Sequence, residues 1–177
     1  MIYEFRYQTP SGFSDITMLS DGEALIGLHF NGSRKLVRTD GTVTERDLPI
    51  FRVTQCWLDI YFHGRQPEFT PPCRLYGITP FRRDVLHEVS NIPYGTTATY
   101  GAIASTLAKR RRLAHMSAQA VGNAVGWNPL CIIIPCHRVL GAANRLTGYG
   151  GGIENKIALL KLEGFCTSHL VTPLHSL

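Results

Sequence analysis

The stretch "IIIPCHRV", residues 132–139, sets three isoleucines and a proline directly before Cys136, His137 and Arg138. An aliphatic run of this kind predicts a buried strand. Because proline cannot donate to a strand's hydrogen-bond ladder, we expect the strand to end at Pro135 and to leave Cys136 in the following turn. On residue types alone Cys136 is an inert thiol, a metal ligand or a nucleophile, and cysteines beside aliphatic runs most often fill cores.

A nucleophilic cysteine needs help from its neighbours. A free thiol has a pKa of ~8.5, so it is only slightly ionised at neutral pH, and apolar surroundings oppose ionisation further. His137 could supply this help as a base if a third group oriented its ring. Glu163 is a candidate for that group, since it is one of only four acidic residues in residues 78–164. Only the fold decides whether its carboxylate reaches His137.

Cysteine spacing and hydrophobicity argue against a disulfide-rich, zinc-binding or membrane protein. The five cysteines form no CxxC pair and no Cys/His quartet at zinc-finger spacing, so the sequence predicts neither a disulfide framework nor a structural metal site. No window approaches the ~20 apolar residues of a membrane span, and the N-terminus "MIYEFRYQTP" carries charges where a signal peptide is apolar. We therefore expect a cytoplasmic protein with no membrane partner.

Charge is unevenly divided along the chain. Residues 1–77 hold 8 Lys and Arg against 9 Asp and Glu, whereas residues 78–164 hold 10 against 4, an excess of +6. A basic half of this kind is typical of proteins that bind an anionic partner, with nucleic acid as the first candidate.

The first half of the chain alternates short apolar stretches with turn signals. The stretches "MIYEFRY", "DITMLS", "EALIGLHF" and "KLVRT" are separated by "TPSG", "SDG" and "NGS". This pattern predicts a small antiparallel sheet. In "FRVTQCWLDIYFHG", the residues Val53, Trp57, Ile60 and Tyr61 recur near helical spacing, which predicts one helix packed on that sheet.

The second half predicts helices. In "TPFRRDVLHEVSNIP", Thr79 stands where a helix N-cap is expected, with Pro80 in the first turn. "TYGAIASTL" and "SAQAVGNAV" predict two short helices joined by the basic connector "AKRRRLAHM", a helix-turn-helix pattern. A last helix, "GIENKIALLKLEG", ends at Gly164. We expect an α+β protein with domains at residues 1–77 and 78–164, followed by a tail at 165–177.

Five motifs occur in a specific order. They are "IPYGTTATYG" (92–101), "AQAVGNAVGWNPL" (118–130), "IIIPCHRV" (132–139), "TGYGGG" (147–152) and "LEG" (162–164). In this order and spacing the chain resembles the O6-alkylguanine-DNA alkyltransferases, also called methylated-DNA–protein-cysteine methyltransferases. The resemblance covers residues 80–164, and the first 77 residues fit by position and length. It implies a ribonuclease H-like N-terminal domain and a C-terminal domain with a winged-helix-like helix-turn-helix.

The resemblance also assigns chemical roles. Cys136 would accept the alkyl group of an O6-alkylguanine, with O4-alkylthymine as a second candidate substrate, and each molecule would act once without cofactor or metal. His137 would act through a water as the base, with Glu163 orienting its ring. Asn128 would brace the turn that presents the cysteine, and Tyr100 would hydrogen-bond N3 of the base and supply a proton equivalent.

The same resemblance describes the pocket and the contacts with DNA. Main-chain groups at Cys136, Val139 and Gly150 would read the guanine edge, with Tyr149 as a wall, and glycine stands at 150 where the family has serine. A monomer would place the helix at 117–125 in the minor groove of double-stranded DNA and flip the alkylguanine out. The implied DNA contacts are Ala118, Gln119, Gly122, Asn123, Arg138, and the basic run Lys109, Arg110, Arg111 and Arg112.

The helix at 117–125 departs from the family pattern at Gln119, which stands where the intercalating arginine is expected, and at Asn123, which replaces a glycine.

Three other functions compete with alkyl transfer. A non-catalytic alkyltransferase-like binding module would lack the acceptor cysteine that "PCHR" retains. A methylation-sensing regulator would carry a further DNA-binding domain, and a thiol hydrolase would need an oxyanion hole that the sequence does not suggest.

Overall fold

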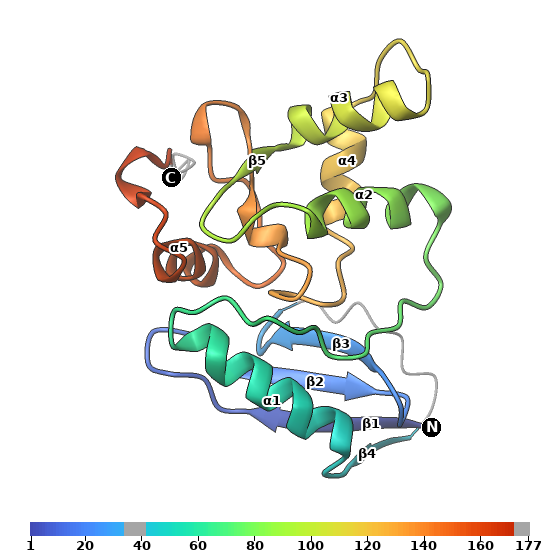
Figure 1. The fold of residues 1–177 in the computed structure, drawn as a ribbon, viewed down its shortest axis with the longest axis vertical. Coiled ribbons are helices and arrows are strands. Elements are labelled where there is room, and N and C mark those ends of the chain that lie inside the picture. The colour runs from blue at the N-terminus through green and yellow to red at the C-terminus, as the bar shows by residue number, and fades with distance from the viewer. Residues whose placement is uncertain (34–41, 172–177) are drawn as a thin grey trace.

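The structure is a computed structural model that describes residues 1–33 and 42–171 (Figure 1). One end of the molecule is a four-stranded sheet with a helix against it, and the other end is built from the remaining helices. The α+β class predicted from the sequence is confirmed. Among the described residues, none of the helices has both the length and the apolar character that crossing a membrane requires.

The sheet has the strand order β3-β2-β1-β4. Its strands are β1 (Ile2–Tyr7), β2 (Ile16–Ser20), β3 (Leu25–Phe30) and β4 (Val43–Glu45). The first three pair antiparallel, as the alternating stretches predicted, whereas β4 pairs parallel with β1 at the edge and was not predicted. The strand predicted at "KLVRT", residues 35–39, lies outside the described residues.

Helix α1 (Pro49–Phe62) packs on this sheet and begins with proline in its first turn. It buries one face, formed by Ile50, Phe51, Thr54, Trp57, Leu58, Tyr61 and Phe62. The predicted helix is confirmed, but the placement of Val53 on its buried face is wrong, since Val53 is 42% exposed. The apolar stripe runs through residues 50, 54, 57 and 61, and position 53 lies to one side of it.

The helix predicted after Thr79 and the two predicted helix-turn-helix segments are all helices in the structure. They are α2 (Pro80–Ser90), α3 (Tyr100–Arg110) and α4 (Ala118–Val125), and each begins after a capping hydroxyl, from Thr79, Thr99 and Ser117 respectively. Each hydroxyl accepts a hydrogen bond from a first-turn amide that has no partner within its helix. Helix α3 runs further than predicted, so Lys109 and Arg110 lie in its last turn, where positive charge interacts favourably with the helix dipole.

The isoleucines at 132–134 form a turn, so the prediction of a strand is wrong. Ile132 has φ 69°, which breaks the extended conformation, and the amide of Ile134 bonds back to the carbonyl of Leu130 at 2.9 Å. The turn touches the sheet at one point, where Leu28 pairs with Leu130. Hydrophobic pattern alone does not separate a buried turn from a buried strand, because both exclude water from their side chains.

Cys136 follows that turn in a short 3-10 helix, η1 (Cys136–Arg138). This helix leads into β6 (Val139–Leu140), which pairs parallel with β5 (Ala98–Thr99) just before α3. The predicted last helix is α5 (Ile153–Leu162), followed by Gly164 at φ +81°. Two further 3-10 helices are η2 (Ala142–Asn144) and η3 (Thr167–His169). Cys136 is thereby set between α4 and α5.

A continuous hydrophobic cluster joins the sheet to the helices. It includes Phe30 of β3, Leu58 of α1, Val85 of α2, Val121 of α4 and Leu159 of α5, and it extends to Cys136. Since this burial is shared across both ends of the molecule, the sheet and α1 support the segment that carries Cys136.

The contact between Gly151 and the sheet is tight enough to test this packing. A Cβ at Gly151 would lie 2.6 Å from the Tyr149 ring and 2.7 Å from the Phe30 ring. We expect Gly151→Ala to lower the free energy of unfolding by about 1–3 kcal/mol, the usual cost of overpacking, as measured by urea denaturation.

Gly150→Ala is the matched control, because a Cβ at Gly150 would meet nothing within 4 Å. We expect its stability to match that of the wild type within about 0.5 kcal/mol. Equal losses of stability in both variants would contradict the tight packing of Gly151.

Candidate active site around Cys136

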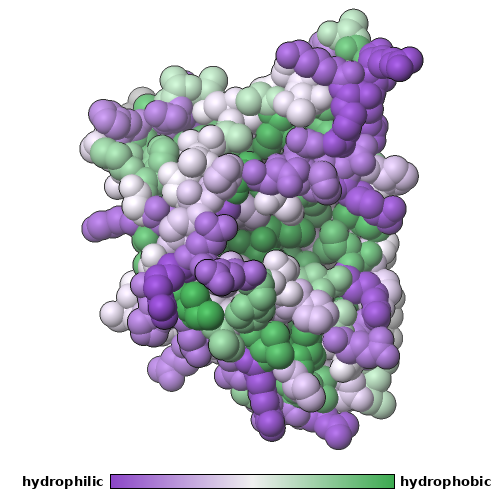
Figure 2. Space-filling view, in the orientation of Figure 1, coloured by the Kyte–Doolittle hydropathy of each residue, from purple (hydrophilic) through white to green (hydrophobic). Residues whose placement is uncertain are grey.

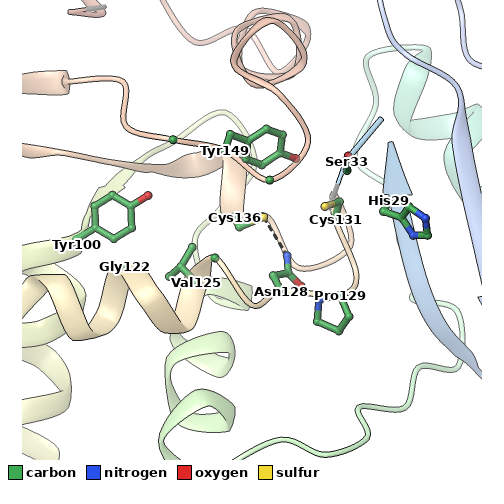
Figure 3. A pocket seen from close by; sticks show the side chains of 13 residues that line it. His29, Ser33, Tyr100, Gly122, Val125, Asn128, Pro129, Cys131, Cys136 and Tyr149 are labelled. Carbon is green, nitrogen blue, oxygen red and sulfur yellow. Dashed lines mark hydrogen bonds between the residues drawn. The ribbon is translucent and has the colours of Figure 1, made fainter. Parts of the chain in front are cut away.

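Asn128 holds the turn that presents Cys136. Its side-chain Nδ2 donates to the Cys136 Sγ at 3.0 Å and to the carbonyl of Ile134 at 2.8 Å, while its Oδ1 accepts from the amide of Leu130 at 3.0 Å (Figure 3). Asn128 is 3% exposed. One buried side chain therefore ties the start of the turn to its end and contacts the sulfur directly.

The surroundings of Cys136 favour its thiolate. A hydrogen bond from the Cys131 thiol is the largest influence that lowers the pKa of Cys136, and it acts against burial, which raises that pKa. The hydrogen bond from Asn128 and the charge of Lys156 lower the same pKa further. Donors and a positive charge stabilise an ionised sulfur, so the buried thiol is more acidic than its apolar setting alone would allow.

Lys156 is a buried cation from α5. Its side chain is fully buried, and Nζ donates to the carbonyl of Val139 at 2.7 Å. Burial lowers the pKa of Lys156 to about 8, while the charge of Cys136 acts in the opposite direction. Lys156 and a Cys136 thiolate thus stabilise each other's charged form. The bond to Lys156 also occupies one lone pair of the Val139 carbonyl that we expected to face the guanine.

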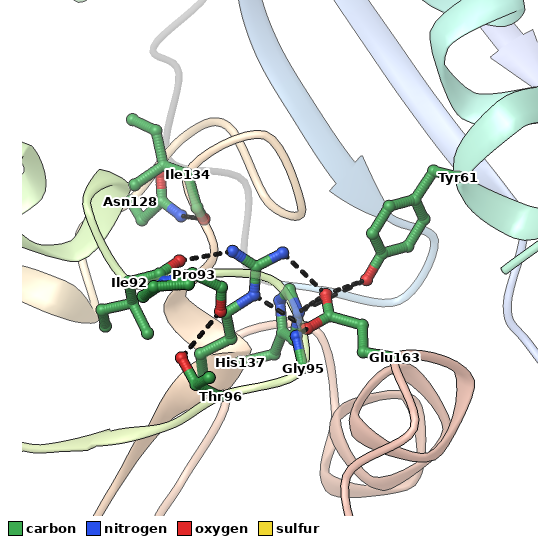
Figure 4. Close-up of polar contacts among 10 residues, drawn as sticks. Tyr61, Ile92, Pro93, Gly95, Thr96, Asn128, Ile134, His137 and Glu163 are labelled. Atoms are coloured by element: carbon green, nitrogen blue, oxygen red, sulfur yellow. Dashed lines mark hydrogen bonds and ion pairs between the residues drawn. The ribbon is translucent and has the colours of Figure 1, made fainter. Parts of the chain in front are cut away.

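His137, next to Cys136, belongs to a separate buried network centred on Glu163 (Figure 4). The Nε2 atom of His137 lies 2.7 Å from Glu163 Oε1, and the Tyr61 hydroxyl donates to the same oxygen at 2.6 Å. Arg138 donates to both carboxylate oxygens, from Nε at 2.8 Å and from Nη2 at 2.9 Å. The amide of Gly95 donates to Oε2 at 3.1 Å. The carboxylate of Glu163 therefore does reach His137.

The network determines the protonation states of Glu163 and His137. Burial raises the pKa of Glu163, but hydrogen bonds from His137 and Arg138 outweigh this effect and lower the pKa to about 2. Burial lowers the pKa of His137 below its ordinary value despite the neighbouring carboxylate. His137 is therefore neutral at pH 7. Because the Glu163 carboxylate can only accept a hydrogen bond, the neutral His137 ring carries its proton on Nε2. The Nδ1 atom then keeps a lone pair that can accept a proton. This buried Nδ1 has no hydrogen-bond partner among the described residues.

The structure places Arg138 inside the protein, although the sequence predicted it among the DNA contacts. Its side chain is 10% exposed, and besides Glu163 it donates to the carbonyl of Ile92 at 2.6 Å. A guanidinium with these partners is held away from phosphates, and we assign Arg138 to the support of Glu163 instead.

The other residues expected at the site line one cavity. Tyr100, Asn128, Cys136, Tyr149 and Gly150 all contribute to it, together with His29, Ser33, Gly122, Val125, Gly126, Pro129, Cys131 and Gly148 (Figure 3). The cavity has a volume of about 50 Å³. The Tyr100 hydroxyl accepts a hydrogen bond from Thr147 Oγ1 at 3.0 Å, so the hydrogen of Tyr100 itself remains free to donate.

A second, open groove of about 520 Å³ lies beside this cavity. Ala118, Gln119, Gly122 and Asn123 of α4 line it, and it shares Tyr100, Gly122 and Gly148 with the cavity. The four residues that the sequence predicted on the DNA-facing helix are thus brought together, on a face that leads toward Cys136.

The basic run Lys109–Arg112 covers the last turn of α3 and the start of the connector that follows it. Figure 2 shows hydrophilic residues gathered there, over the end of α3 and the following connector. Arg110 forms an ion pair with Glu88, and Arg111 forms one with Asp84. Lys109 and Arg112 are exposed, and neither forms an ion pair within the described part of the chain. Half of the run is therefore already paired with acidic side chains of α2.

Three residues of the site were missed by sequence reasoning. Tyr61 was expected only in the helix that packs on the sheet, and neither Cys131 nor Lys156 was given a chemical role. A lysine in an amphipathic helix is ordinarily exposed, so nothing in the pattern of α5 indicated a buried cation. The spacing of Cys131 and Cys136, five residues apart across a turn, was the one available signal.

Comparisons with known proteins agree with this geometry. The family model described as "6-O-methylguanine DNA methyltransferase, DNA binding domain" matches residues 80–165. A methylated-DNA–protein-cysteine methyltransferase of Methanosarcina acetivorans is 36% identical over 165 residues, which cover 93% of this chain and 100% of that protein. One of Haemophilus influenzae is 35% identical over 163 residues, which cover 92% of this chain and 86% of the relative.

A solved structure shows the same fold. The crystal structure of Mycobacterium tuberculosis OGT in complex with DNA matches with a TM-score of 0.75 and 37% identity, covering 92% of this chain and 91% of that one. Similarity of this extent spans both the sheet and the helices. The chain belongs to the family of methylated-DNA–protein-cysteine methyltransferases.

Proposed function

We propose that the protein repairs DNA by moving an alkyl group from O6-alkylguanine onto the sulfur of Cys136, once per molecule. The observation that carries this assignment is the position of the Cys136 thiol, which lies on the wall of a cavity, accepts a hydrogen bond from Asn128 and is next in sequence to the buried His137–Glu163 pair. An acidified thiol suits this reaction, since a soft sulfur nucleophile attacks an alkyl carbon readily.

The proton and electron transfers can be assigned to atoms. The Nδ1 atom of His137 accepts the thiol proton through a water, and the Cys136 thiolate attacks the alkyl carbon. The new S–C bond forms as the C–O6 bond breaks, and guanine leaves with the electron pair. Burial raises the pKa of Tyr100, so its hydroxyl stays protonated and can supply the hydrogen bond or proton that the departing base needs. A thioether has no route back, which makes the reaction single-turnover.

The groove along α4 is the proposed DNA contact. A base inside a duplex is out of reach of a buried thiol, so the nucleotide must be flipped out at a cost of a few kcal/mol. The small residues Ala118 and Gly122 on the groove wall suit close approach to the minor groove of double-stranded DNA, and Gln119 lies at the helix start beside them. Tyr100 and Gly122 line both the groove along α4 and the cavity that contains Cys136, so the groove and the cavity adjoin each other.

The same proposal covers the setting in which the protein acts. A thiol acceptor has to stay reduced, which is the normal condition of the cytoplasm, and the described chain carries only free cysteines. The protein acts as a monomer, with residues 1–77 as support and 78–164 as the domain that carries the acceptor. A non-catalytic binding module remains the second candidate function, and the retained Cys136 argues against it.

Mass spectrometry separates these two functions. After incubation with a duplex oligonucleotide that contains O6-methylguanine, the tryptic peptide with Cys136 is expected to gain one methyl group, with no more than one per protein molecule. Cys136→Ala is expected to bind the same duplex without any gain in mass. Binding by the wild type with no change in mass would instead support the binding module.

The pKa of Glu163 predicts a pH-dependent share of stability. A carboxylate with a pKa of 4.5 when unfolded and about 2 when folded stabilises the folded state at neutral pH, and this share is lost as the pH falls from about 4.5 to about 2. Glu163→Gln is therefore expected to lower the free energy of unfolding at pH 7 by up to about 3 kcal/mol, and by less at acidic pH. Urea titrations across this pH range measure the difference.

Glu68→Gln provides the control, because Glu68 is exposed. We expect it to change stability by no more than about 0.5 kcal/mol at any of these pH values. A loss in Glu163→Gln that stays constant with pH would show that the carboxylate charge is not what stabilises the network.

Gln119 can be tested by restoring a charge. Gln119→Arg is expected to speed transfer from duplex DNA about threefold relative to transfer from free O6-benzylguanine, since a cation that stacks on a neighbouring base contributes roughly 0.6 kcal/mol. The two rates are compared by single-turnover kinetics at one salt concentration. Gln8→Arg, which adds the same charge at an exposed position of the first half, is the control. An equal acceleration with both substrates would refute a role in base extrusion.

A further inference from the structure

A second thiol lies beside the proposed acceptor. Cys131 and Cys136 are each 6% exposed, and both line the same cavity. The turn between them is closed by hydrogen bonds from the amide of Ile133 to the carbonyl of Cys131 at 2.8 Å, and from Ile134 to Leu130 at 2.9 Å. This turn brings the two cysteines together, and Figure 3 shows their side chains next to each other above Asn128.

The two thiols are chemically unequal. The interaction between the two thiols is the largest influence on both: it raises the pKa of Cys131 well above its ordinary value and lowers that of Cys136. Cys136 is therefore the sulfur that ionises, while Cys131 remains a thiol in contact with it. A reactive cysteine with a second cysteine poised beside it is the arrangement that redox-sensitive sites use.

We propose that Cys131 and Cys136 form a dithiol site for hydrogen peroxide, in which Cys131 converts oxidised Cys136 into a reversible disulfide. The consequence is protection, because a sulfenic acid that meets no thiol proceeds to sulfinic and sulfonic acids that cellular thiols do not reduce. The alkyl acceptor would be blocked during oxidation and recovered afterwards.

The chemistry balances in two steps. The Cys136 thiolate attacks one oxygen of hydrogen peroxide, the O–O bond breaks, and hydroxide leaves as water after taking a proton, so that Cys136 becomes a sulfenic acid. The Cys131 sulfur then attacks the Cys136 sulfur, an S–S bond forms, and the S–O bond breaks. The departing hydroxide takes the proton of the Cys131 thiol and leaves as a second water. The two sulfurs lose two electrons in total, and peroxide gains them. A small dithiol reverses the change by exchange.

The cavity permits this oxidant. Its volume of about 50 Å³ exceeds the ~10–15 Å³ that one water needs, so a molecule of the size of hydrogen peroxide can enter beside both sulfurs. The turn places both cysteines on the wall of this cavity, and closing the disulfide brings their sulfurs to about 2.0 Å. The exposed cysteines Cys56, Cys73 and Cys166 have no partner thiol within the described chain.

The sequence offers a clean readout. Trypsin cleaves after Arg112 and Arg138, so the peptide of residues 113–138 contains Cys131 and Cys136 and no other cysteine. After stoichiometric hydrogen peroxide, we expect this peptide to lose the mass of two hydrogens and to resist iodoacetamide at both cysteines. Fragment masses separate this change from oxidation of Met116, which lies in the same peptide.

Activity and two cysteine variants complete the test. The wild type is expected to lose its reaction with O6-benzylguanine after peroxide and to recover it fully with dithiothreitol. Cys131→Ser and Cys131→Ala, each compared with its own reactivity before oxidation, are expected to gain oxygen atoms at Cys136 and to stay inactive after dithiothreitol. Cys56→Ser, which changes an exposed cysteine, is expected to behave as the wild type does.

Two outcomes would overturn the proposal. One is a wild-type peptide 113–138 that gains oxygen without losing two hydrogens. The other is a Cys131→Ser protein that recovers with dithiothreitol as completely as the wild type. The peptide masses do not require alkyl transfer, so failure of the dithiol proposal and failure of the proposed function give different results.

Discussion

The buried carboxylate of Glu163 is the interaction on which the site depends. Its side chain is fully buried, and a charge in that position is tolerated only if hydrogen-bond donors surround it. The donors come from separate parts of the chain: Tyr61 from α1, Gly95 from the segment before β5, and His137 and Arg138 from η1. Holding one carboxylate therefore positions the helix that packs on the sheet, the segment before β5 and the segment that carries Cys136.

Cys136 is tuned by a second set of groups that is distinct from the Glu163 network. Asn128, Cys131 and Lys156 act on the sulfur, whereas Glu163 acts on the imidazole of His137. This separation has a chemical benefit, because the thiol is made acidic without making the histidine a cation. A neutral His137 can accept a proton, which a histidine protonated by direct pairing with the thiolate could not do.

Sequence reasoning succeeded where a local signal determines the structure and failed where packing does. The helix after Thr79 was predicted from its capping hydroxyl, which acts within one turn, and in the structure Thr99 and Ser117 cap the next two helices in the same way. Ile132–Ile134 were predicted as a strand because burial was correctly inferred but the left-handed backbone of Ile132 leaves no trace in hydrophobic pattern. The buried state of Lys156 and Arg138 arises from contacts with Val139 and Glu163 that are distant in sequence. The role of motif residues such as Asn128 came from the family resemblance, and not from spacing.

The net charge of residues 78–164 exaggerates the positive charge available to attract DNA, because several of the basic side chains are already paired. Of the four acidic residues in this range, Asp84 and Glu88 pair with Arg111 and Arg110, and Glu163 pairs with Arg138. The Arg138 pair is buried, whereas the two pairs on α2 are exposed, and exposed pairs contribute only about 0–1 kcal/mol each. In the proposed complex with DNA, a phosphate would replace Asp84 or Glu88 at little cost and so release the guanidinium groups of Arg110 and Arg111. Under that proposal, with the uncharged Gln119 at the groove, attraction to the DNA backbone would depend on the end of α3, and the approach of the base to Cys136 would depend on the small residues of α4.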